Sequence, residues 1–243
     1  MACVLVTGAA TGLGRNTVAA LLDDGHEAVL HARHPGRLTD VRDLLDRGAV
    51  PVTGDLATHE GTLSVVEQAN TLGGIDAVIH NAGVYDGPDT LAVNVLAPYL
   101  LTCLVTGPDR HVYLSSSMHN AGHADAGLID SRGPGLPLGY SDSKLFVTAL
   151  AAAVPRRLPA VHSFAVDPGW VPTRMGGPSA PDDLTLGHVT QFHLATASDP
   201  DATGGYWHHQ HRQTPHRAVR DEGFQDEVLD ALAHRTGITL TPR

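Results

Sequence analysis

The sequence predicts an α/β fold in one domain, with helices on both faces of a doubly wound parallel β-sheet. Short runs rich in valine, leucine and isoleucine alternate along the chain with stretches of helical periodicity, which is the pattern of βαβ units. A length of 243 residues suits one domain. No repeat, linker or shift in composition divides the chain, so we expect a single domain over residues 1–243.

Six apolar runs are expected to form parallel strands, because a strand covered by helices on both faces has no polar side. They are residues 2–7, 27–32, 49–54, 75–80, 111–116 and 161–166, and a short seventh strand is expected at 204–209. Helices are expected at 12–23, 37–47, 58–72, 88–106, 140–154 and 223–235. Two segments rich in glycine or proline, 118–139 and 174–183, are expected to be loops that shape a pocket at the carboxyl ends of the strands.

Composition argues against several classes of protein. A net charge of −10 disfavours binding to nucleic acid or to an anionic membrane, which requires a basic surface. Two cysteines, Cys3 and Cys103, are too few for a disulfide framework. The apolar run MACVLVTGAA is too short for a signal or membrane-spanning segment. We therefore expect a cytoplasmic protein without nucleic-acid or membrane partners.

The expected first strand ends in the glycine-rich sequence TGAATGLGR. Glycines lack a Cβ atom and let the backbone approach a diphosphate, and the following helix offers free N–H groups at its positive end. Glycine also serves ordinary tight turns, but a position between the first strand and a helix favours dinucleotide binding. The residues expected at the phosphates are Gly8, Thr11, Gly12, Leu13, Gly14 and Arg15.

The end of the second strand bears on which cofactor binds. An NAD site carries a carboxylate here for the ribose hydroxyls, but this chain has Ala32 followed by Arg33. A guanidinium pairs with a 2′-phosphate, and Arg15 is placed to reach the same group. The pattern therefore favours NADP(H) over NAD(H), with a solvated surface arginine as the alternative interpretation of Arg33.

Further motifs follow the other strands in order. The chain carries TGAATGLG (7–14), Asp55-Leu56, HNAG (80–83), Asn94 within VNVLAP, LSSS (114–117), YSDSK (140–144) and DPGWVPT (167–173). With these motifs it resembles the short-chain dehydrogenase/reductase family over essentially its whole length, a family with a Rossmann-type fold. The motifs SSSMH, YSDSKL and DPGWVPT are most similar to those of the subgroup of retinol dehydrogenases and related carbonyl reductases.

Lys144 is the only lysine among the 16 lysine and arginine residues of the chain. In a helix it lies one turn after Tyr140, on the same face. A phenol has a pKa of about 10, and a nearby ammonium stabilises its phenolate. Lysine also offers three donors for the ribose hydroxyls, whereas arginine does not lose its proton and cannot join a proton relay.

The resemblance implies roles for individual residues. Tyr140 would be the general acid in reduction and the base in oxidation, Lys144 would lower its pKa, and Ser116 would hydrogen-bond the substrate oxygen. Ser115 and Ser117 remain alternatives to Ser116. Asn94 would anchor a water molecule, or would be a buried polar group satisfied by the backbone. Further cofactor contacts are implied at Asp55, Leu56, Asn81, Ala82, Gly83, Tyr140, Lys144, Pro168, Gly169, Val171 and Thr173.

Three features leave alternatives open. The interval from Gly83 to Asn94 is shorter than the family usually has, which puts the usual assembly in question and leaves homodimer formation open. The alanine-rich stretch 149–154 suits either a dimer contact or a crowded core. The sequence HHQH (208–211) is reminiscent of a metal-binding tract, but strand alternation separates its side chains, and we expect no metal. His119 is expected near the mouth of the active site.

The sequence thus predicts an NADP(H)-dependent oxidoreductase that interconverts a carbonyl and an alcohol, with Tyr140 as acid and base. The expected substrate is a small to medium apolar ketone or aldehyde. Two alternatives remain: a protein that binds NADP(H) as a sensor or scaffold without turnover, and an epimerase or lyase of the same fold with a tightly held cofactor.

Overall fold

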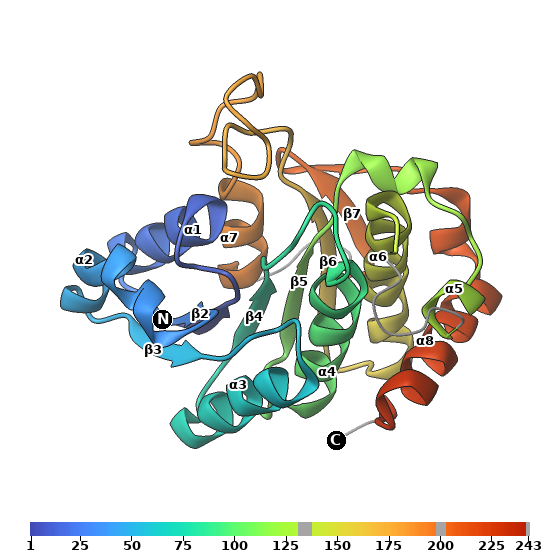
Figure 1. The fold of residues 1–243 in the computed structure, drawn as a ribbon, viewed down its shortest axis with the longest axis horizontal. Helices are drawn as coiled ribbons and strands as arrows, with labels where there is room; N and C mark the ends of the chain where they lie inside the picture. The colour runs from blue at the N-terminus through green and yellow to red at the C-terminus, as the bar shows by residue number, and fades with distance from the viewer. Residues whose placement is uncertain (131–137, 198–202, 242–243) are drawn as a thin grey trace.

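The computed structural model describes residues 1–130, 138–197 and 203–241. Eight strands form one sheet in the order β3-β2-β1-β4-β5-β6-β7-β8, parallel except for β8, which pairs antiparallel with β7 (Figure 1). The strands are β1 (Cys3–Val6), β2 (Glu27–Ala32), β3 (Val50–Thr53), β4 (Ala77–His80), β5 (Arg110–Leu114), β6 (His162–Asp167), β7 (Gly205–His208) and β8 (His211–Gln213). The predicted α/β fold with a mainly parallel sheet is confirmed.

All six predicted helices are present. They are α1 (Gly12–Asp23), α2 (Arg42–Asp46), α3 (His59–Leu72), α4 (Ala97–Leu104), α6 (Tyr140–Arg157) and α8 (Glu222–Thr236). A 3₁₀ helix, η1 (Pro35–Val41), precedes α2, and a π-helical turn, η2 (Ala92–Leu96), precedes α4. η1 begins with Pro35, at a helical position where the missing N–H of proline costs no hydrogen bond.

Several short elements were not predicted. They are η3 (Ser117–Ala121), α5 (Gly127–Asp130), α7 (Val189–Thr196), η4 (Arg217–Arg220) and strand β8. Two of them lie in segment 118–139, so the prediction that this segment is entirely loop is wrong; its residues 131–137 lie outside the described residues. α5 forms because Ile129 is fully buried in the core that α8 also lines. Tertiary burial here outweighs the weak helical propensity of a glycine-rich sequence.

Helices cover both faces of the sheet because alternate residues of each strand point to opposite sides. Val4 and Val6 pack with residues of α1 and α7, whereas Leu5 packs with residues of α3 and α4. Toward the other end of the sheet, α6 and α8 share one core with Tyr113 of β5. The central strands β1, β4, β5 and β6 are therefore buried along nearly their whole length, as their sequences indicate.

The alanine-rich stretch of α6 lies in the core of the chain itself. Ala149 and Ala153 are fully buried, in the same cluster as Val228 and Leu232 of α8. Small side chains at these positions let α6 lie close to its neighbours. Of the two interpretations of this stretch, the crowded core accounts for its burial within one chain.

The order of the strands reverses at β1, which has β2 on one side and β4 on the other. Ligands of open α/β sheets bind at such a switch point, beyond the carboxyl ends of the strands. The loop that follows β6 stands above these ends at the top of Figure 1. The motifs after β1, β4, β5 and β6 consequently face one region of the molecule.

Candidate active site

Tyr140 and Lys144 lie at the start of α6, one helical turn apart. Tyr140 is the first helical residue because Gly139 before it is extended, with φ of −60° and ψ of 143°. The Lys144 side chain is buried, donates from Nζ to the carbonyl oxygen of Leu114 at 2.7 Å, and has Nζ 5.4 Å from the centre of the Tyr140 ring. The predicted pair therefore shares one side of α6, beside the end of β5.

Among the three serines after β5, Ser116 is the one whose side chain acts on Tyr140, where it lowers the pKa of the phenol in part. The hydroxyl of Ser115 is buried and bonded to Thr148 at 2.6 Å. Ser117 begins the 3₁₀ helix η3, and its N–H donates to Asp167 at 2.9 Å. The structure thus brings together Ser116, Tyr140 and Lys144, and turns the Ser115 hydroxyl to the opposite side.

Asn94 lies in the π-helical turn η2, a type of distortion that is frequent at functional sites. Its Oδ1 accepts from the Val84 N–H at 2.9 Å, and its Nδ2 donates to the Val84 carbonyl at 2.9 Å and to the Ser143 hydroxyl at 3.0 Å. The side chain is 2% exposed. These contacts fasten the loop after β4 to α6 and satisfy the amide within the protein.

The pKa values of the two central groups move in opposite directions. Burial raises the pKa of Tyr140 to about 12, although the Ser116 hydrogen bond lowers it in part. Burial lowers the pKa of Lys144 to about 8. The charge of Asp167 raises both values. Because the charged form of each group is disfavoured by burial, the site is poised with a protonated phenol at neutral pH.

The glycine turn after β1 packs against the HNAG motif after β4. Gly8 has a φ of +65°, and a Cβ there would lie 2.8 Å from the Cα of Ala82. A Cβ at Gly14 would lie 2.5 Å from Nδ2 of Asn81, which donates to the carbonyl of Thr7 at 2.8 Å. Gly8 and Gly14 are therefore required by the close packing of this turn at the start of α1.

Gly83 faces Asn94 and Lys144, two of the residues predicted to be catalytic. A Cβ at this position would lie 3.5 Å from Oδ1 of Asn94, 3.7 Å from Nζ of Lys144 and 3.7 Å from Cε of Met175. The missing side chain keeps open the space in front of the ammonium. A nicotinamide ribose is the group that the resemblance places there, and the space is consistent with it.

Sequence reasoning missed His31, which supports the glycine turn from β2. Its Nδ1 accepts from the Gly8 N–H at 3.0 Å, and its Nε2 donates to the Gly54 carbonyl at 2.9 Å. Burial lowers its pKa, which favours the neutral ring that both contacts require. A histidine inside an otherwise apolar strand was the available signal.

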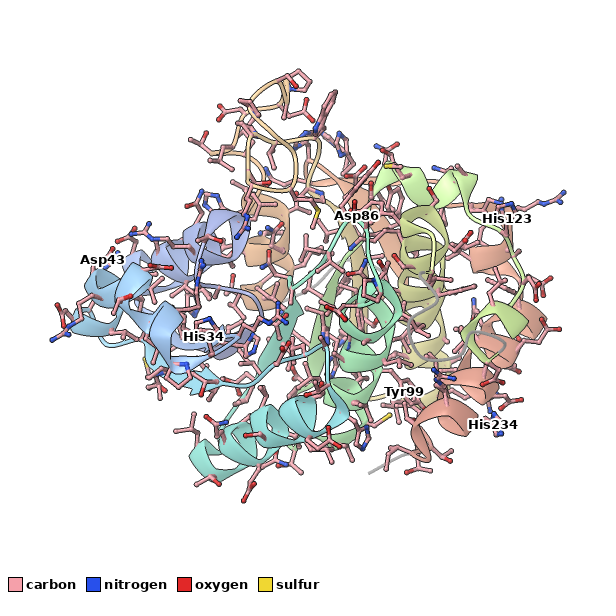
Figure 2. All side chains as sticks on the ribbon, viewed as in Figure 1. His34, Asp43, Asp86, Tyr99, His123 and His234 are labelled. Carbon is pink, nitrogen blue, oxygen red and sulfur yellow. The ribbon has the colours of Figure 1, made fainter. Side chains whose placement is uncertain are left out.

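Arg33 and Asp55 contact each other at the ends of β2 and β3. The Arg33 side chain is 64% exposed, and its Nη2 lies 2.7 Å from Oδ2 of Asp55. Nη2 of Arg15 pairs similarly with Oδ2 of Asp43 at 2.6 Å, on the flank where Figure 2 labels Asp43. Both predicted phosphate ligands thus have acidic partners, and Asp55 is the residue expected at the adenine end.

The loop after β6 lies over the glycine turn. A Cβ at Gly12 would lie 3.4 Å from Cγ2 of Thr173, and one at Gly187 would lie 2.7 Å from Cδ2 of Leu13 and 3.4 Å from the Pro168 carbonyl. Val171 is buried within this loop. Leu56, by contrast, is buried in the core under α3. Thr173 and Pro168, which are predicted to line the nicotinamide pocket, thus lie near the glycine turn, whereas Thr11 is exposed at its edge.

Met175 and Tyr85 lie beside Tyr140, and sequence reasoning did not single them out. The hydroxyl lies 3.9 Å from Sδ of Met175, and the Tyr85 ring centre lies 4.8 Å from that of Tyr140. Trp170 is 56% exposed, with its indole N–H bonded to the Gly176 carbonyl at 2.8 Å. Exposed aromatic and thioether groups next to the Tyr140 hydroxyl suit an apolar ligand.

His119 is fully buried, so its predicted place at the site's mouth is wrong. Its Nδ1 donates to the Ser116 carbonyl at 2.7 Å, and its Nε2 accepts from the His216 N–H at 3.0 Å. It supports the serine turn from behind, whereas His123 points outward (Figure 2) and is 81% exposed. The order of residues could not distinguish these two histidines.

The HHQH tract forms the turn between β7 and β8. His209 and Gln210 have φ values of 44° and 65°, and His208 bonds through Nδ1 to the Asp167 carbonyl at 3.2 Å. Among residues 1–130, 138–197 and 203–241, the structure contains no group of three metal-ligating side chains arranged around a common point. Over the same ranges, each helix is too short or too polar to cross a membrane.

Comparisons with known proteins agree on one family. A short chain dehydrogenase family model matches residues 2–102. The chain is 33% identical to the short-chain dehydrogenase chry4 of Gibberella zeae over 99% of both chains. It is 29% identical to human retinol dehydrogenase 13, over 71% of this chain and 60% of that protein.

Solved structures show the same fold. A blue fluorescent protein from a metagenomic library, in complex with NADPH, superposes with a TM-score of 0.71 at 21% identity, covering 85% of this chain and 95% of that one. The motifs, the sheet and the relatives lead to one conclusion. The chain belongs to the short-chain dehydrogenase/reductase family.

Proposed function

We propose that this protein is an NADP(H)-dependent oxidoreductase that interconverts a ketone or aldehyde and an alcohol. The observation that carries the proposal is the cluster of Ser116, Tyr140 and Lys144, in which the Ser116 side chain lowers the pKa of the phenol and the buried Lys144 has Nζ 5.4 Å from the centre of its ring. A protein that only sensed or stored the cofactor would have no need of a buried, protonated donor of this kind.

The proposed reaction uses the chain's own groups for the proton. A carbonyl oxygen placed between Ser116 and Tyr140 would accept hydrogen bonds from both hydroxyls, which stabilise the charge that develops there. Tyr140 would transfer its proton to that oxygen, and the Lys144 ammonium would stabilise the phenolate that remains. When bound, NADP(H) would supply or receive the hydride. In oxidation the phenolate of Tyr140 would take the proton back.

The cofactor fit rests on three parts of the site. The turn around Gly8 and Gly14 presents backbone where side chains would clash. Gly83 keeps space in front of Lys144. Arg33 is 64% exposed, and position 32 is alanine, so no carboxylate at that position would repel a 2′-phosphate. NADP(H) preference follows from these charges, with Asp55 as the competitor for Arg33.

The proposed substrate is an apolar, uncharged carbonyl compound. Tyr85 and Met175 contact Tyr140 itself, and Trp170 lies on the same loop as Met175. Their exposed apolar surface would be removed from water by such a ligand, at about 25 cal/mol per Å². Reduction is the proposed working direction, because Tyr140 is protonated at neutral pH.

Cytoplasmic location and the absence of nucleic-acid and membrane partners remain predictions from composition. A homodimer, if formed, would use a surface other than the inner face of α6, since α8 packs there within the same chain. The proposed partner is the small-molecule substrate alone.

The proposed function is tested by cofactor binding followed by turnover. We expect NADPH to bind more tightly than NADH, and Arg33→Ala to remove that difference while Arg42→Ala, a control at an 80% exposed arginine, does not. NADPH consumption is then measured with a panel of ketones and aldehydes for wild type and Tyr140→Phe.

Turnover by wild type that is lost in Tyr140→Phe, with NADPH binding retained, supports the proposal. Binding without consumption across the panel would favour a sensor. Cofactor that copurifies, with substrate converted but no net NADPH use, would favour an epimerase or lyase. Failure to bind either dinucleotide overturns the proposal.

A further inference from the structure

A buried carboxylate joins the two loops that flank the catalytic tyrosine. Asp167, the last residue of β6, is 5% exposed. Its Oδ2 accepts from the Ser117 N–H at 2.9 Å, and its Oδ1 accepts from the Gly169 N–H at 3.0 Å. The first bond fixes the turn that carries Ser116, and the second fixes the start of the loop that leads to Thr173. One side chain therefore sets the separation of the two loops.

Donors and titratable groups from three elements face this carboxylate. From β7, the Tyr206 hydroxyl donates to Oδ2 at 3.1 Å, and Nδ1 of His208 lies 3.7 Å from the same oxygen. From α6, Tyr140 and Lys144 interact with its charge, and so does His119 of η3. A buried carboxylate persists only when donors and cations surround it. The N–H groups of Ser117 and Gly169 and the Tyr206 hydroxyl satisfy its two oxygens.

We propose that Asp167 is a positioning residue for the proposed reaction: its two oxygens hold Ser116 and the Gly169 loop in a fixed relation, and its charge opposes loss of a proton from the pair formed by Tyr140 and Lys144. The inference rests on the proposed function. The Tyr140 proton is the one transferred in carbonyl reduction. The Lys144 proton maintains the positive charge that stabilises the phenolate. Asp167 consequently favours the state in which Tyr140 and Lys144 are both protonated, which is the state that reduction requires.

The direction of the effect does not depend on which group of the pair releases its proton first. A fixed anion makes release from either one less favourable, because each release removes positive charge or adds negative charge near it. Burial opposes the charge of Lys144 and of the Tyr140 phenolate, and Asp167 raises the pKa of both groups. Removing the charge of Asp167 therefore moves the first deprotonation of the pair to lower pH.

The test is the pH profile of kcat/KM for NADPH-dependent carbonyl reduction by wild type, Asp167→Asn, Asp167→Glu and Tyr206→Phe. In Asp167→Asn we expect the alkaline limb to move down by about one pH unit, a tenfold change in the apparent ionisation constant. Tyr206→Phe removes a hydrogen bond to the carboxylate and keeps the charge, so its limb stays within about 0.3 unit of wild type. A purely structural role for Asp167 would lower the rate without moving the limb.

Asp167→Glu separates charge from geometry. It keeps the anion, so we expect an unmoved limb, but its longer side chain displaces the two loops and lowers kcat by about tenfold or more. Circular dichroism and thermal unfolding establish that each variant folds. If Asp167→Asn does not fold, Asp167→Ser, a smaller neutral residue, takes its place in the pH profile: an alkaline limb moved down supports the proposal, and an unmoved limb in an active Asp167→Ser overturns it.

Two results overturn the positioning role alone: an unmoved limb in an active Asp167→Asn, or in the Asp167→Ser that takes its place, or an Asp167→Glu with wild-type kcat. Wild type that binds NADPH but reduces no carbonyl overturns the proposed function, and this inference with it. The two failures are distinguishable because the second appears in the wild-type protein, before any substitution is made.

Discussion

Arg33 donates from Nε and Nη2 to the same carboxylate oxygen of Asp55, at 2.9 and 2.7 Å. The hydrogen bond to Asp55 is the main cause of a raised pKa at Arg33. The pair joins the residue proposed to read the 2′-phosphate to the residue expected at the adenine end. Binding of the proposed cofactor, NADP(H), would therefore compete with a contact that the protein already makes.

Asp55→Asn is expected to tighten NADPH binding about threefold to tenfold, because it removes the competing charge and leaves an oxygen for the Ala57 N–H. NADH, which lacks the 2′-phosphate, is the control for effects at the adenine end. The dissociation constants of both cofactors for wild type and variant check this. An equal change for NADPH and NADH would contradict the competition.

Lys144→Met is expected to abolish turnover and to raise the free energy of unfolding at pH 7 by about 1–3 kcal/mol, because it removes a buried ammonium. Burial lowers the pKa of Lys144 from 10.5 to about 8 in the folded state. Between these two pH values Lys144 is protonated in the unfolded chain but not in the folded one, so the stability of wild type rises with pH. The stability advantage of Lys144→Met over wild type therefore becomes smaller as the pH rises. Urea unfolding of wild type and Lys144→Met at pH 7 and pH 10 measures this difference in stability. A variant less stable than wild type at both pH values would contradict the prediction.

Gly8→Ala and Gly25→Ala form a matched pair that separates backbone strain from crowding. The two glycines have similar φ values, +65° and +77°, but a Cβ at Gly8 would lie 2.8 Å from Ala82, whereas one at Gly25 meets no atom within 4 Å. We expect Gly25→Ala to cost about 1 kcal/mol and Gly8→Ala about 2–4 kcal/mol. Thermal or urea unfolding of both variants checks this, and equal losses would show that crowding against Ala82 adds nothing.

Met175→Ala is expected to raise the KM for an apolar ketone about threefold to tenfold and to change kcat less, because the thioether lies beside the Tyr140 hydroxyl and contributes mainly binding surface. Leu63→Ala, at an exposed leucine of α3, is the control. Steady-state kinetics of both variants provide the measurement. A lower kcat with an unchanged KM would instead indicate that Met175 stabilises the transition state.

His31 predicts how stability responds to mild acid. In the folded state, burial lowers the pKa of His31 below its ordinary value of 6.5. The neutral ring therefore contributes stability above pH 6.5, and this contribution is lost as the pH falls below that value. His31→Gln keeps one acceptor and one donor without titrating. We expect its unfolding free energy between pH 7 and 5 to fall less steeply than that of wild type, by up to about 1.4 kcal/mol per pH unit. Parallel curves would exclude this role.

The sequence by itself determined the features that depend on short-range order along the chain. The alternation of apolar runs predicted the parallel sheet, and 27–32 and 12–23 match β2 and α1 to the residue. The interval from Tyr140 to Lys144 placed both on one helical face, since helical periodicity fixes the geometry of residues four apart. The turn after β1 could be predicted from its glycines because only glycine fits it.

Only the tertiary structure decided the contacts between residues far apart in the chain. LSSS does not reveal which serine faces Tyr140, because a hydroxyl's direction depends on how β5 turns into η3. α7 has little pattern of its own and forms where Leu194 is buried against the sheet. Asp167 holds two loops because β5 and β6 end side by side. Such contacts depend on where separate strands end in space, which no local spacing encodes.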